Sequence, residues 1–145
     1  MKYLLIWLLL FTTITITAQE LSAYQWQNRL LLVVASNKES EELAAQLALL
    51  QEDKEGLKER KLIVFQIVQD SYAKGIEVPK KWHKSTLEYG SKENTDDKLL
   101  VHLIGLDGGL KRTWDSPVRP NVIYSLIDQM PMRRAEMRRR GKTRH

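Results

Sequence analysis

Residues 30–68 read LLLVVASNKESEELAAQLALLQEDKEGLKERKLIVFQIV, and this stretch decides the fold. It begins and ends with short runs, 30–35 and 62–68, which are apolar on both alternating faces apart from one glutamine. Such runs are typical of central strands that are covered on both sides. Ser36 precedes Glu39 by three residues, a capping-box spacing that predicts the start of a helix. A strand, a helix and a strand in this order predict a right-handed parallel crossover.

The segment between the two strands has a helical pattern. Its leucines recur at steps of four, three and seven residues, at Leu43, Leu47, Leu50 and Leu57. Polar side chains occupy most of the other positions. We therefore expect a helix that packs one apolar stripe against the sheet.

The next segment, residues 69–97, loses this periodicity. It is polar and interrupted by glycines and a proline, so we expect a long connection with one short helix around residues 85–89. Within it, Lys80-Lys81-Trp82-His83-Lys84 combines cations with an aromatic ring. That composition suits a membrane surface or a glycan, but a soluble loop with a half-buried Trp82 is the favoured interpretation.

Two further strands are predicted over residues 98–105 and 110–114. Asp107 and Gly108 lie between them, and we expect this pair to supply the positive φ angles of a tight hairpin turn. The two strands should therefore be antiparallel neighbours.

A second helix is predicted over residues 122–130. Its apolar residues follow a helical stripe, Asn121 is its expected cap, and Pro131 is expected to end or kink it. The complete order of strands and helices is that of the thioredoxin core. We predict an α/β fold, thioredoxin-like, with a four-stranded mixed sheet flanked by helices.

The N-terminal segment predicts export. Residues 1–18 begin with a charge, continue as an apolar run and fade into threonines, which is the layout of a cleavable secretory signal. A transmembrane anchor is the competing interpretation, but a bilayer span needs about 20 apolar residues. We predict a signal peptide over 1–18, a domain over 19–130, a basic C-terminal tail over 131–145, and a periplasmic or secreted location.

The positive charge of the chain is concentrated in that tail. The formal net charge is +5. Residues 131–145 alone contribute +6, because they contain seven Lys or Arg residues and a single acidic residue, Glu136. The remainder of the chain is close to neutral, so the domain as a whole is not expected to seek polyanions.

The chain contains no cysteine, which excludes thiol chemistry and disulfides. The position where a thioredoxin-type enzyme needs its thiolate is occupied by Ser36, which we interpret as a helix cap rather than a nucleophile. The histidines are far apart in sequence, so we predict no metal site, no cofactor and no catalytic residue. His102 is expected to be a hydrogen-bonded interior histidine, and His83 a surface residue.

Four motifs together resemble a known family. They are Trp26-x-Asn28-Arg29-Leu30-Leu31, Glu59-Arg60, Leu103-Ile104-Gly105-x-Asp107-Gly108-Gly109 and Ile127-Asp128-x-Met130-Pro131-Met132-Arg133-Arg134-x-Glu136-Met137-Arg138. The resemblance is to domain-of-unknown-function family 4174, which is thioredoxin-like and similar to the repeated domain of some vertebrate extracellular-matrix and sushi-repeat proteins. It implies a fold and no activity. The chain departs from the family pattern at Lys61 and Leu106.

The basic tail is the main candidate for binding. Arg133, Arg134 and Arg138 can make forked contacts to phosphate, sulfate or carboxylate groups, and Asp128 is an expected partner of Arg133 or Arg134. From Arg139 onward, a solvated, frayed end is the favoured interpretation. We therefore predict a binding or structural module.

The predicted partner is a protein or an acidic component of the cell envelope. Nucleic acid is not expected, because no stacking platform is visible. Two alternatives stay open. One is an enzyme with thiol-independent chemistry that uses His102, Asp107 or Ser36, and the other is a polyanion-binding protein.

Overall fold

The computed structural model describes residues 19–85 and 98–142. The predicted signal peptide, 1–18, lies outside the described residues, and so does most of the helix expected around 85–89. Within the described part of the chain, no helix is both long and apolar enough to cross a bilayer.

The strands form one mixed sheet that is wider than predicted. In the described residues it has six strands, in the order β4-β3-β2-β1-β5-β6, so the prediction of four strands is wrong. The strands are β1 (Arg29–Ala35), β2 (Leu62–Val68), β3 (Ser71–Lys74), β4 (His83–Lys84), β5 (Leu100–Ile104) and β6 (Leu110–Trp114). The two additional strands, β3 and β4, come from the segment that was expected to be a connection. They are four and two residues long, too short to produce a clear alternating pattern.

The strand pairings agree with the other predictions. β1 pairs with β2 in parallel, while β5 pairs antiparallel with both β1 and β6. The hairpin turn differs in detail, because Gly108 has a φ of 79° but Asp107 does not have a positive φ. Gly105 and Gly109 close the turn with a backbone hydrogen bond of 2.9 Å, and the longer loop needs only one left-handed residue.

The helices begin at other residues than predicted. They are α2 (Gln19–Ser22), α3 (Glu41–Gln51), α4 (Lys54–Glu59), α5 (Pro120–Asp128) and α6 (Pro131–Lys142). Ser40, and not Ser36, caps α3 by accepting a hydrogen bond from the Leu43 N–H. Asp53 starts α4 in the same way, through the Gly56 N–H. The predicted single helix is therefore two.

The last two helices also correct the sequence interpretation. α5 has Pro120 in its first turn and no side-chain cap, so the prediction that Asn121 caps it is wrong. α6 continues to Lys142, so the described part of the predicted tail is helical, and its side chains from Arg139 to Lys142 are exposed. Pro131 begins this helix, a position where its missing N–H costs nothing.

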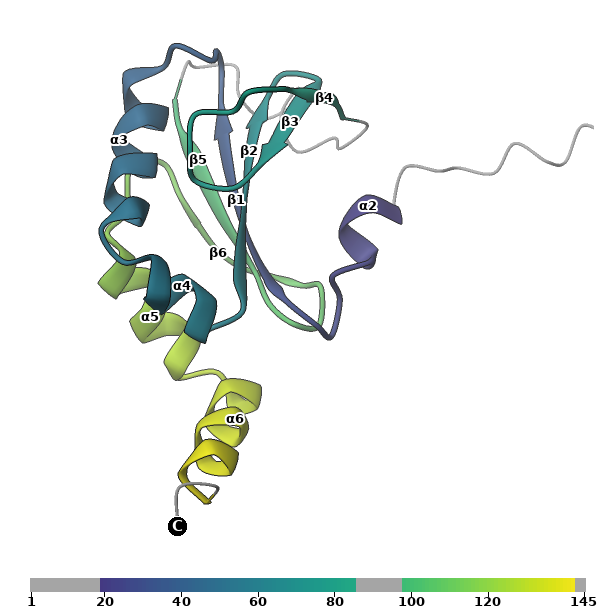
Figure 1. The fold of residues 1–145 in the computed structure, drawn as a ribbon, viewed down its shortest axis with the longest axis vertical. Helices are drawn as coiled ribbons and strands as arrows, with labels where there is room; N and C mark the ends of the chain where they lie inside the picture. Colours follow the sequence, from purple (N-terminus) through teal and green to yellow (C-terminus); the bar gives the residue numbers. More distant parts are fainter. Residues whose placement is uncertain (1–18, 86–97, 143–145) are drawn as a thin grey trace, which may run out of the picture.

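Apolar side chains cover both faces of the sheet. On one face, β1, β2 and β5 pack against α3, α4 and α5, as in the contacts of Leu31, Leu47 and Ile127. The other face carries Leu32, Phe65 and their buried neighbours, with Tyr24 and Tyr72 packed against them. Helices α3, α4 and α5 lie together on one side of the sheet, α2 lies on the other, and α6 projects beyond α5 (Figure 1).

Candidate functional site

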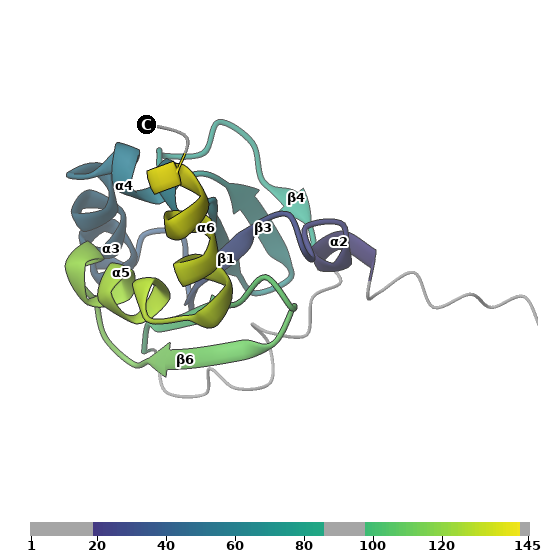
Figure 2. The same ribbon diagram turned by 90° about the horizontal axis from the view of Figure 1, so that it is seen from below.

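Arg133 attaches α6 to the rest of the domain. Its side chain is only 1% exposed, and its Nη2 lies 2.7 Å from Glu59 Oε1 at the end of α4. Its Nε lies 3.1 Å from Asp128 Oδ1 at the end of α5, and its Nη1 donates to the Glu59 carbonyl at 3.2 Å. One guanidinium therefore joins the ends of three helices, which lie next to each other in Figure 2.

Arg60 holds the same carboxylate from a second direction. It makes a forked contact to Asp128, with Nη2–Oδ2 at 2.6 Å and Nε–Oδ1 at 3.1 Å. The guanidinium carbon also lies 4.3 Å from the centre of the Tyr124 ring. Forked contacts of this kind fix direction as well as distance.

Arg29 connects this cluster to the first strand. It is 1% exposed, and its Nη1 donates to the Arg60 carbonyl at 2.9 Å and lies 3.4 Å from Glu136 Oε2 of α6. Glu136 also lies 3.5 Å from Arg133. We call Arg29, Glu59, Arg60, Asp128, Arg133 and Glu136 the ionic cluster; it contains three cations and three carboxylates.

The pKa values in the ionic cluster follow from its geometry. Burial would raise the pKa of Asp128, but hydrogen bonds from Arg60 and Arg133 outweigh it and hold that pKa below its ordinary value. Burial would lower the pKa of Arg133, but hydrogen bonds to Asp128 and Glu59 raise it instead. The ionised forms of both Asp128 and Arg133 are therefore favoured in the folded protein.

The predicted binding residues thus divide into two sets. Arg133 and Asp128 are engaged within the molecule, which confirms the expected pairing of Asp128 with one of these arginines. Arg134, Arg138 and Lys142 are exposed and follow one another at steps of four residues, about one helical turn, along α6. We call these three cations the outer row of α6. In the described residues, no carboxylate forms an ion pair with Arg134 or Arg138.

The three residues named for an enzyme do not meet. His102 lies at the centre of β5, opposite Leu32 of β1, is 3% exposed, and shares a hydrogen bond of 2.9 Å with Thr113. Ser36 follows the end of β1, and Asp107 lies beyond the opposite end of the sheet, where it pairs with Lys111 at 2.6 Å. This arrangement provides no nucleophile with a base. In the part of the chain that the structure describes, no group of three or more potential ligands is placed to hold a metal ion.

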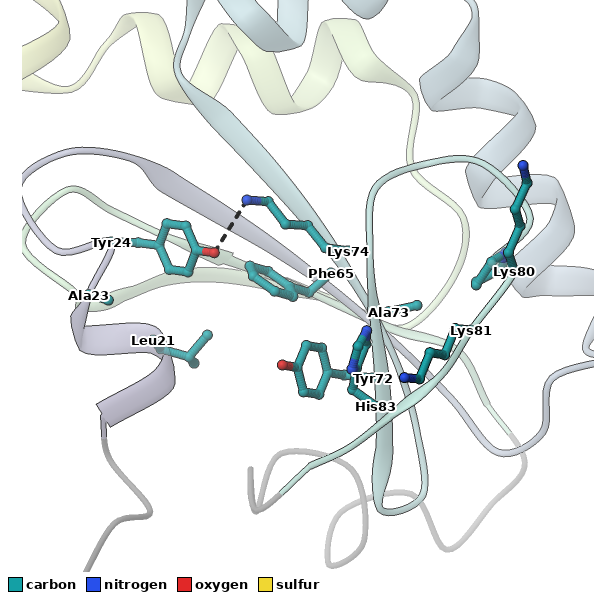
Figure 3. A pocket seen from close by; sticks show the side chains of 11 residues that line it. Leu21, Ala23, Tyr24, Phe65, Tyr72, Ala73, Lys74, Lys80, Lys81 and His83 are labelled. Carbon is teal, nitrogen blue, oxygen red and sulfur yellow. Dashed lines mark hydrogen bonds between the residues drawn. The ribbon is translucent and has the colours of Figure 1, made fainter.

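A cavity on the sheet face opposite α3 was not predicted from the sequence. It has a volume of about 430 Å³. Its described lining consists of Leu21, Ala23, Tyr24, Phe65, Tyr72, Ala73, Lys74, Pro79, Lys80, Lys81 and His83. Figure 3 shows these side chains around the opening. The only sequence signal for it was the run from Lys80 to Lys84, because the other residues come from separate elements.

Trp82 lies between two lining residues of this cavity, Lys81 and His83, but does not line the cavity itself. It is half-buried and packs against the cluster that includes α3, and Lys38 Nζ lies 4.9 Å from the centre of its ring. His83 is exposed, as expected, and its ring lies 5.5 Å from that of Tyr72.

Comparisons with known proteins agree with the fold. A family model described as a domain of unknown function (DUF4174) matches residues 20–136. No curated protein matches the sequence. Among solved structures, the chain is similar to a reduced 2-Cys peroxiredoxin from Plasmodium vivax, with 12% identity and a TM-score of 0.51. The similarity covers 74% of this chain and 79% of the peroxiredoxin chain. At that identity the likeness extends to the thioredoxin-like fold alone.

Proposed function

The chain belongs to the DUF4174 family and has a thioredoxin-like fold, and from this premise we propose that it is an exported, non-redox module that binds an acidic partner protein. The contact surface is the outer row of α6. The family description assigns no activity, so the proposal rests on the residues of this chain.

The observation that carries the proposal is the pair Arg134 and Arg138. Both are exposed on one face of α6, and no described carboxylate neutralises them. Like charges four residues apart destabilise a helix by about 0.2–0.5 kcal/mol. An external carboxylate would remove this repulsion, and arginine is well suited to forked recognition of carboxylates.

The ionic cluster supports the proposal because it fixes the orientation of α6. Arg133 is held by three carboxylates from α4, α5 and α6 itself. A helix fixed in this way presents its outer row with little loss of conformational entropy on binding.

The non-redox part of the proposal follows from composition. Peroxide and disulfide chemistry in a thioredoxin-like fold depend on a thiolate, and the chain has no cysteine. Among the described hydrogen bonds, the Ser36 hydroxyl has only a contact of 3.4 Å from the amide of its neighbour Asn37 and no base beside it. The pattern of residues 1–18 supports the proposal of export.

Affinity purification from the cell-envelope fraction tests this function. The wild-type protein is compared with the double variant Arg134→Ala/Arg138→Ala and with a control, Lys58→Ala/Arg112→Ala, which removes the same charge from exposed positions of α4 and β6. We expect a protein partner to be lost only from the α6 variant. Equal recovery with all three proteins would refute the outer row as the contact surface.

The same variants distinguish a polyanion as the partner. Retention on a heparin column that falls steeply with salt, together with no protein partner in the affinity purification, would indicate a polyanion-binding protein instead.

A further inference from the structure

We propose that the cavity beside β3 is a binding site for a small planar organic anion, such as an aromatic carboxylate. The site is separate from the outer row of α6 and is built on the opposite face of the sheet from α3.

Aromatic side chains form a continuous surface in the cavity. The Phe65 ring lies 5.5 Å from Tyr24, in an edge-to-face arrangement, and 6.0 Å from Tyr72. The Tyr72 ring in turn lies 5.5 Å from His83 and is inclined to it by 31°. Such a surface favours a flat ring, because aromatic groups gain from offset stacking and edge contacts beyond the area they bury.

The strand register explains why these side chains share one face. Tyr72 of β3 lies opposite Ile67 of β2 and opposite His83 of β4, and Lys74 lies opposite Phe65. Side chains two residues apart on a strand point to the same side. Two cross-strand pairs, Tyr72 with His83 and Phe65 with Lys74, therefore supply the floor of the cavity.

The remaining wall is held by the hairpin between β5 and β6. Trp26 donates its N–H to the Leu106 carbonyl at 2.6 Å, and Gln25 donates to the Asp107 carbonyl at 2.8 Å. These bonds fix the segment that carries Tyr24. Lys74 also contacts Tyr24, with its Nζ 3.3 Å from the phenol oxygen.

The charges of the cavity favour an anion. Its described lining includes Lys74, Lys80 and Lys81 and no carboxylate. Lys81 lies across the cavity from Tyr24 and Lys74, with its ammonium toward Tyr72 and His83, whereas the Lys80 ammonium points away from these rings (Figure 3). Lys74 and Lys81 therefore place cations on two sides of the cavity. The volume of about 430 Å³ lies within the range of small-molecule sites.

Titration with a pair of probes tests this site. The probes are 2-naphthoate and its neutral analogue 2-naphthylmethanol, with binding followed by calorimetry and by NMR chemical shifts. We expect 2-naphthoate to saturate one site, to shift signals of Tyr72 and His83, and to bind several-fold more tightly than the neutral probe.

Three variants provide the matched comparison. Lys81→Met removes one exposed charge and should weaken 2-naphthoate binding about two- to five-fold, with little effect on the neutral probe. Tyr72→Leu should weaken both probes. Lys58→Met, on α4, should change neither. Thermal melting checks that each variant is folded.

Some results would overturn the proposal. They are the absence of saturation with 2-naphthoate, unchanged affinity for 2-naphthoate in Lys81→Met, or equal affinity for the charged and neutral probes. Binding of anionic vesicles or of a neutral oligosaccharide in place of 2-naphthoate would assign this surface to a membrane or a glycan and would also contradict it.

Discussion

Asp128 and Arg133 form an ion pair across the break between α5 and α6, with Asp128 Oδ1 and Arg133 Nε 3.1 Å apart. The break is where Pro131 starts the new helix. The residue order of α6 provides no continuous apolar stripe, and a helix that is polar all round needs other interactions to hold it in place. Ion pairs of the buried Arg133 with Glu59 and Asp128 therefore attach α6 to the domain.

Replacing Arg133 by Met should destabilise the protein strongly. The side chain is 1% exposed and contacts Glu59, Asp128 and Glu136. The carboxylates left behind are 20–51% exposed and can be solvated, so we expect a loss of about 1.5–3 kcal/mol, the contribution of hydrogen bonds to charged groups. We expect this loss in the free energy of unfolding measured with urea. The matched control, Arg134→Met, is exposed on the same helix and should change it by at most about 0.5 kcal/mol. Equal effects of the two substitutions would contradict the assigned role of Arg133.

Replacing Asp128 by Asn should change how stability depends on pH. Arg60 and Arg133 lower the pKa of Asp128 in the folded protein, so folding favours its ionised form. The resulting stabilisation is present above the unfolded pKa of about 3.9 and is lost as the pH falls through the lower folded value.

At neutral pH, Asp128→Asn should therefore cost about 2 kcal/mol, because hydrogen bonds to charged groups contribute about 1.5–3 kcal/mol. The difference from wild type should shrink below about pH 4. Urea unfolding at a series of pH values measures it, and a difference that stays constant down to pH 2 would exclude an ionised Asp128 as the cause.

Replacing Gln46 by Leu should also destabilise the protein. Gln46 of α3 is fully buried, and its amide makes two hydrogen bonds to the backbone of Val118, at 2.7 and 3.0 Å. Leucine would leave both backbone groups without these partners, at about 1–3 kcal/mol each. The control is Gln51→Leu, which removes a hydrogen bond to the Ile76 carbonyl at an exposed position of the same helix, where water can replace it. A melting temperature unchanged by Gln46→Leu would show that water replaces the lost bonds.

The N-terminal segment should be absent from the mature protein. If residues 1–18 are a secretory signal, the intact mass of the protein isolated from the envelope or the medium should correspond to a chain that begins at Gln19. Recovery of the uncleaved mass from the membrane fraction would favour the anchor instead.

The sequence predicted the part of the fold that depends on long apolar patterns. The runs at 30–35 and 62–68 are β1 and β2, and they pair in parallel as expected. The wrong cap has a local cause. Ser36 and Ser40 each precede a polar stretch, and only Ser40 is followed directly by acidic residues in the first turn, Glu41 and Glu42.

The candidate sites were harder to predict because they depend on contacts distant in sequence. Arg29 and Glu136 are 107 positions apart in the chain, so no local pattern identifies the ionic cluster. The motif around Met130 indicated that Arg133 and Arg134 matter, but only the structure separates a buried Arg133 from an exposed Arg134. The cavity near β3 combines residues from several elements in the same way.

Titration of the ¹⁵N-labelled protein with a hexaglutamate peptide tests the central claim most directly, namely that the outer row of α6 binds an acidic partner. We predict salt-sensitive shifts of the Arg134, Arg138 and Lys142 amide signals that are absent in Arg134→Ala/Arg138→Ala. Shifts confined to other surfaces, or shifts that persist in the variant, would contradict the claim.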